Sequence, residues 1–227
     1  AEDGIRDHCV TGVQTCALPI FHKAESKDEV MAFCDALIEQ LKTKVYGGRV
    51  IEVEYDTRDI RGGDKTWQWI KRGAPIRLEV GPRDVAEGSV FMARRDKGPK
   101  EKESVKVEDF VARVADILQE IQDGLLAKAR AFRKEHTRVI DTKEEFYAYF
   151  SAPETGENQP APIHGGFALA HFNGDPKLEE EIKNDLAVTV RCIPLDGQDL
   201  CDDDGQPGTC PFTGEPSARR VVWAKSY

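Results

Sequence analysis

The sequence predicts two small domains, an α/β domain with a mixed sheet and a smaller α+β domain after it. Helical and strand-like periodicities alternate over residues 21–127, and a second series of elements begins near residue 142. A length of 227 residues is also more typical of two small domains than of one. We therefore expect one domain over 21–127 and a second over 128–227.

The first domain is expected to open with a helix at Ser26, because Ser26 and Glu29 have the spacing of a capping box. Apolar residues at 51, 53 and 55 alternate with glutamates, which predicts a half-buried strand. A short helix over 66–71 and strands over 76–80 and 90–92 should follow. A long helix is predicted from about residue 107 to 136, with Phe132 on its buried stripe.

The second domain has its own helix start, since Thr142 and Glu145 form another capping box before Phe146 and Phe150. Residues 152–164 contain three prolines and are expected to form a loop. Further strands are predicted over 167–171, 188–193 and 221–225, with a helix over 177–186 that follows a proline. Helices and short strands together predict the α+β class.

Residues 1–20 are expected not to belong to the natural protein. The segment VTGVQTCALPI, Val10–Ile20, resembles the translation of a common sequencing-library adapter. We therefore interpret Ala1–Ile20 as an assembly artefact, to be excluded from functional arguments as a fusion scar is.

Composition restricts the class of protein. No run of about 18 apolar residues indicates a membrane-spanning helix. The six cysteines form no Cys-x-x-Cys pair, which is typical of a reducing cytosol, so we expect a cytoplasmic protein. The net charge is −9, yet residues 61–102 hold eleven Lys/Arg against six Asp/Glu. A basic stretch of this kind can contact phosphates, although a solvated charged face is the simpler alternative.

One motif is the most specific feature of the chain. The stretch KTWQWIKRGAPIRLEVGPRDV, Lys65–Val85, resembles the anticodon-binding domain of class II aminoacyl-tRNA synthetases. Within it, GAPIRLEVGPRD resembles prolyl-tRNA synthetase of the archaeal and eukaryote-like type. The segments GGFALAHFNGD and VRCIPLD and the ending RRVVWAKSY are similar to the C-terminal domain of the same family.

The resemblance implies residues that read the anticodon. Arg77 on a strand, with Arg83 and Asp84 in the following turn, match positions that read the two guanines of the proline anticodon. An arginine can bond guanine at O6 and N7 together, and an aspartate can accept from N1–H and N2–H₂. Unpaired loop bases expose these edges to a protein.

Further residues are expected at the same site. Trp67 offers a stacking surface, and Arg94 and Arg95 should lie near phosphates or bases. The chain departs from the family at two positions, since relatives commonly have a glutamate in place of Ile70 and an aromatic residue in place of Thr66. The assignment of individual bases to individual residues therefore stays open.

The C-terminal domain of many relatives binds zinc through two cysteine pairs. The corresponding positions here are Asn173, Leu178, Cys210 and Thr213, so only one thiol remains. Structural zinc takes four ligands, mostly thiolate or imidazole, and we therefore expect no metal. No histidine forms a sequence-local catalytic pattern, and no nucleophile is proposed.

The resemblance implies that the parent enzyme joins proline to its tRNA with ATP and magnesium. Its catalytic core would precede Phe21, so this fragment is expected to need no cofactor and to be inactive alone. Tyr227 matches a terminal tyrosine that supports the active site. Expected partners are tRNA(Pro), the missing catalytic domain and a second subunit of the intact homodimer, but neither membrane nor DNA. The alternatives are a synthetase for threonine, glycine or histidine, and a stand-alone RNA-binding accessory module.

Overall fold

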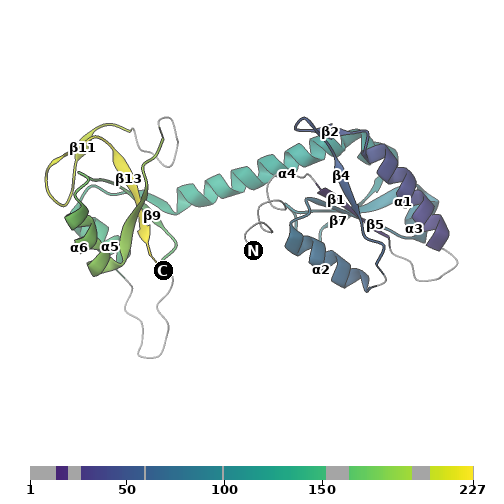
Figure 1. Ribbon diagram of the computed structural model, residues 1–227, viewed down its shortest axis with the longest axis horizontal. Helices are drawn as coiled ribbons and strands as arrows, with labels where there is room; N and C mark the ends of the chain where they lie inside the picture. The colour runs from purple at the N-terminus through teal and green to yellow at the C-terminus, as the bar shows by residue number, and fades with distance from the viewer. Residues whose placement is uncertain are drawn as a thin grey trace, which may run out of the picture. The chain divides into compact units, whose positions relative to one another are not determined.

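The computed structural model describes residues 14–19, 27–58, 60–98, 100–151, 164–195 and 205–226. The chain divides into two compact units, Ala1–Ala127 and Lys128–Tyr227 (Figure 1). The helix α4 (Val107–Glu135) begins in the first unit and ends in the second. No described helix is long and apolar enough to cross a membrane.

The first unit is built on a five-stranded mixed sheet, which confirms the predicted α/β class. Its strand order is β4 (Glu52–Tyr55), β1 (Gln14–Pro19), β5 (Ile76–Val80), β6 (Ser89–Arg94) and β7 (Lys102–Lys106). Strand β1 runs parallel to β4 and β5. Strands β5, β6 and β7 are successively antiparallel.

The inner strand β1, which lies between the edge strand β4 and the central strand β5, is inside the segment expected to derive from an adapter. Its residues 14–17 pair with β4, and its residues 15–19 pair with β5. Six residues of that segment therefore connect the two halves of the sheet. The foreign origin of the segment stays a prediction, and residue Ser26, the predicted helix cap, lies outside the described residues.

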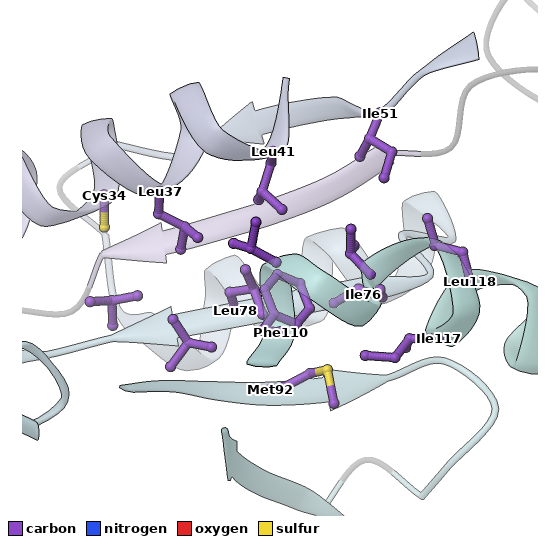
Figure 2. Close-up of a cluster of buried hydrophobic side chains, with 14 of the residues drawn as sticks. Cys34, Leu37, Leu41, Ile51, Ile76, Leu78, Met92, Phe110, Ile117 and Leu118 are labelled. Carbon is purple, nitrogen blue, oxygen red and sulfur yellow. The ribbon is translucent and has the colours of Figure 1, made fainter. Parts of the chain in front are cut away.

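One face of this sheet packs against α1 (Lys27–Leu41) and the first half of α4. Figure 2 shows the side chains of α1, β5, β6 and α4 converging in this core. Ile76, Leu78 and Val80 point into it because alternate residues of a strand share a face. The buried part of α4 runs from Phe110 to Ile121. Phe132, predicted to be buried, is 60% exposed.

The opposite face of the sheet carries α2 (Gly62–Arg72), and α3 (Pro82–Glu87) follows the end of β5. A small hairpin, β2 (Val45–Tyr46) and β3 (Arg49–Val50), follows α1. Helix α2 begins four residues before its predicted start, and neither α3 nor β7 was predicted. Helix α2 ends at Gly73, whose φ of 80° is a left-handed conformation that glycine adopts without strain.

The second unit has a four-stranded sheet in the order β10 (Val188–Cys192), β13 (Arg220–Lys225), β9 (Phe167–His171) and β8 (Thr137–Val139). Helices α5 (Lys143–Phe150) and α6 (Pro176–Leu186) complete it, with a hairpin of β11 (Gly208–Thr209) and β12 (Pro216–Ser217). The Thr142 hydroxyl accepts from the Glu145 N–H, as the capping pattern predicted. Trp223 is fully buried at the centre of this core.

Candidate nucleic-acid interface

The sheet face opposite the α1 and α4 core, which we call the outer face, carries charged residues and one aromatic residue across β5, β6 and β7. Register partners in antiparallel strands point to the same side of a sheet. Two rows therefore cross β5, β6 and β7 on this face: Glu79, Phe91 and Ser104 form one row, and Arg77, Ala93 and Lys102 form the other. The sheet thus places acidic, basic and aromatic side chains next to one another.

Glu79 joins the outer face to α2. Its Oε1 accepts a hydrogen bond of 3.2 Å from the Thr66 hydroxyl and one of 2.5 Å from Lys102 Nζ. The Glu79 and Lys102 side chains are only 13% and 21% exposed, so this ion pair is partly shielded from water. The pair neutralises charge on the outer face and fixes the position of Lys102.

The buried carboxylate of Asp56 anchors α2 to the end of β4. It accepts from Arg58 Nε at 2.8 Å, from Arg58 Nη2 at 2.6 Å and from the Trp69 indole N–H at 2.8 Å. The Lys65 ammonium also donates to the Asp56 backbone carbonyl. Hydrogen bonds from Arg58 and then Trp69 hold the pKa of the Asp56 carboxyl well below its usual range, against the opposing effect of burial.

A groove of about 480 Å³ opens between the outer face and α3. It is lined by Glu79, Phe91 and Ser104 from the sheet, and by residues of α3 that include Arg83 and Asp84. The Phe91 side chain is 37% exposed, and Lys102 Nζ lies 5.8 Å from the centre of its ring. A groove with an aromatic wall and carboxylate acceptors suits a flat ring with hydrogen-bond donors on its edge.

Arg83 and Asp84 lie at the start of α3 and were predicted in a turn. The Asp84 Oδ2 accepts from the Gly81 N–H at 2.8 Å, which satisfies a free donor at the helix start. Arg83 is 90% exposed in its side chain and pairs with Glu87 one turn later at 3.1 Å. These two residues lie together at the groove, with Arg83 open to solvent.

The structure separates Arg94 from the other predicted site residues. Its strand partner is Ile76, so it points to the core face, where it binds Asp96 at 2.9 Å and Glu120 of α4 at 2.7 Å. The hydrogen bonds that Arg94 donates to Asp96 and Glu120 raise its pKa, against the opposing effect of burial. Arg95 follows on the outer side, and its Nη1 donates to the Gly73 carbonyl.

Burial distinguishes the remaining predicted residues. Arg77 lies on a strand, β5, as predicted; it points to the outer face and is only 3% exposed. Trp67 is 58% exposed on α2, whereas Trp69 is buried. Tyr227 lies outside the described residues.

The site also includes Phe91, Glu79 and Lys102, which were not predicted from the sequence. A signal for Phe91 was present, because Val90 and Met92 are the apolar residues that face the core and the residue between them must face outward. The pairing of Glu79 with Lys102 links residues 23 positions apart, and no local pattern predicts it.

The positions that correspond to the family zinc site do not fit the metal. The Asn173 amide donates to Glu215 at 2.6 Å, and the Thr213 hydroxyl accepts from the Glu215 N–H. Cys210 is buried and its N–H donates to the Glu215 carbonyl. Within the described ranges, no three His, Cys, Asp or Glu side chains form a metal-binding group. An amide, a hydroxyl and one thiol are a poor donor set for zinc.

Comparison with known proteins identifies both units. Residues 14–117 match the anticodon-binding domain family, which places the first unit among tRNA-synthetase-type anticodon-binding domains. Residues 160–227 match the family described as "Prolyl-tRNA synthetase, C-terminal". The chain belongs to the prolyl-tRNA synthetase family, in which it comprises an anticodon-binding domain and the C-terminal domain.

Curated relatives agree along almost the whole chain. Proline–tRNA ligase 2 of Anaeromyxobacter dehalogenans is 56% identical over 215 residues, which are 94% of this chain and 41% of the relative. Proline–tRNA ligase of Bdellovibrio bacteriovorus is 42% identical over 210 residues, 92% of this chain and 39% of the relative. That of Protochlamydia amoebophila is 39% identical over 229 residues, 100% of this chain and 43% of the relative. The chain thus spans about two fifths of these relatives.

Proposed function

We propose that this chain binds the anticodon stem-loop of proline tRNA, as the tRNA-recognising part of a proline–tRNA ligase. The observation that carries the proposal is the groove between the outer face and α3, within a domain of the anticodon-binding family. The names of the relatives support proline rather than threonine, glycine or histidine as the amino acid of the parent enzyme.

The chemistry of the groove favours a guanine base. Asp84 uses Oδ2 for the Gly81 N–H, and among the described residues no hydrogen bond to Oδ1 is formed. A carboxylate oxygen in this position can accept from the N1–H and N2–H₂ edge of guanine. The exposed Arg83 guanidinium can reach a phosphate or the O6 and N7 edge, because its one ion pair, with Glu87, lies at the solvent surface.

Trp67 and Arg77 have different roles in this proposal. The exposed Trp67 ring offers a surface on which a loop base can stack. Arg77 is buried, so its direct contact with a base requires the groups that cover it to move. We therefore expect Arg83, rather than the buried Arg77, to make the first contact with RNA.

The activity of the whole enzyme is ATP-dependent attachment of proline to tRNA(Pro), with magnesium, in a homodimer. The matched families in this chain are the anticodon-binding and C-terminal domains, so we expect the 227 residues alone to form no prolyl-adenylate. Proline-dependent exchange of pyrophosphate into ATP measures this step. Exchange above the background of a no-protein control would contradict the expectation.

Fluorescence anisotropy with a labelled RNA stem-loop that carries the proline anticodon tests the binding proposal. Affinity should fall with rising salt, as phosphate contacts require, and should fall about tenfold when an anticodon guanine is replaced by adenine. Arg83→Gln should weaken binding, whereas Arg113→Gln, which removes another exposed charge, from α4, should not. Equal affinity for guanine- and adenine-containing loops would refute the proposal.

A further inference from the structure

We propose that Phe91 is the stacking platform for one unpaired base of the bound RNA, with Lys102 fixed beside it by Glu79. This inference rests on the proposed function and names a residue that reads no base edge itself. It explains why a large apolar ring lies exposed on an otherwise polar sheet face.

The first argument is the position of Phe91. It stands in the middle strand of the row formed with Glu79 and Ser104, and all three line the groove. Its neighbours along β6, Val90 and Met92, are buried on the core face. The ring therefore lies on the side of the sheet away from the core, where 37% of the residue is exposed.

The second argument is the electrostatic setting of the ring. Lys102 Nζ lies 5.8 Å from the ring centre, within the range of a cation–π contact. The same ammonium is held by Glu79, whose second hydrogen bond comes from Thr66 of α2. A base that stacks on Phe91 would have a cation beside it and the carboxylate of Asp84 in the same groove.

The third argument is the size and composition of the groove. A volume of about 480 Å³ accommodates a single planar base. Two of its three acidic residues are compensated locally, Glu79 by Lys102 and Glu87 by Arg83, and the third, Asp84, accepts from the Gly81 N–H. Such a site disfavours a bare phosphate near the carboxylates and favours a neutral ring that has donors on its edge.

The test replaces Phe91 by leucine, which stays apolar but cannot stack, and by tyrosine, which can. Stacking of a base on an aromatic residue accounts for roughly a 5- to 150-fold change in affinity. We expect Phe91→Leu to weaken binding of the proline-anticodon stem-loop within this range, and Phe91→Tyr to restore it. Phe132→Leu serves as the control, because it removes another exposed aromatic ring.

A spectroscopic measurement separates stacking from a structural role. The fluorescent base 2-aminopurine is placed in turn at each anticodon-loop position, and its quenching on binding is recorded. One position should be quenched by the wild-type chain and by Phe91→Tyr but not by saturating Phe91→Leu. Unchanged affinity and unchanged quenching in Phe91→Leu would overturn the inference, as would equal weakening by Phe132→Leu. Failure of the wild-type chain to bind any stem-loop would instead refute the proposed function.

Discussion

Replacing Asp56 by alanine should destabilise the first unit through the loss of a buried acceptor. The Asp56 side chain is 1% exposed and accepts from Arg58 and from the Trp69 indole. In the variant, the Trp69 N–H remains buried without this acceptor, which costs about 1–3 kcal/mol. The Arg58 partner is 46% exposed, so its ion pair adds only about 0.2–1 kcal/mol after screening by solvent. We therefore expect a total loss of about 1–4 kcal/mol.

Urea unfolding of the whole chain, read by hydrogen exchange of the β5 amides, reports the stability of the first unit. The β13 amides report the second unit and should not change. Asp56→Asn keeps one acceptor for Trp69 and should lie between the wild type and Asp56→Ala. The matched control is Asp116→Ala, an exposed aspartate on α4, which should stay within about 0.5 kcal/mol of the wild type. A loss in Asp56→Ala no larger than in this control would refute the reasoning.

Three further results follow from the contacts described above. Because the pKa of Asp56 is lowered in the folded state, the ionised carboxylate stabilises the fold at neutral pH, and this stabilisation is lost as pH falls below about 4. The difference in unfolding free energy between the wild type and Asp56→Asn should therefore shrink when urea titrations are run in acid. Arg94→Gln should cost about 1–3 kcal/mol through loss of its pair with Asp96, while leaving affinity for the RNA stem-loop unchanged in anisotropy titrations. Trp223→Ala should destabilise the second unit by about 3–5 kcal/mol, measured by exchange of the β9 amides; a change under about 1 kcal/mol would contradict its central place in that core.

Local patterns predicted those elements whose apolar residues repeat with a clear period. The strand with Ile76 and Leu78 and the long helix after residue 107 are both present. Helix α3 was missed because its six residues show no period, although Pro82 at its first turn is a typical helix start. The prediction that Phe132 is buried was wrong, because helical spacing shows which face of a helix is apolar but not how far along the helix the core extends.

The candidate site was predictable to the extent that it depends on strand alternation. The same alternation that orients Phe91 outward also turns Arg94 toward α4. The sequence therefore contained enough information to predict that Arg94 and Arg77 lie on opposite faces of the sheet. The partners of Arg94 could not be predicted in this way, since Glu120 is 26 residues away. The contact of Asp56 with Trp69 likewise depends on how α2 folds back onto the sheet.

The position of β1 between β4 and β5 has a practical consequence for anyone who shortens this chain. A version that starts at Phe21 removes the strand that hydrogen-bonds to both β4 and β5. Two rows of backbone donors and acceptors would then face water in place of their ladder partners. Unpaired strand edges recruit strands from other molecules, so such a version should aggregate, and a recombinant boundary belongs before Gln14 whatever the origin of those residues.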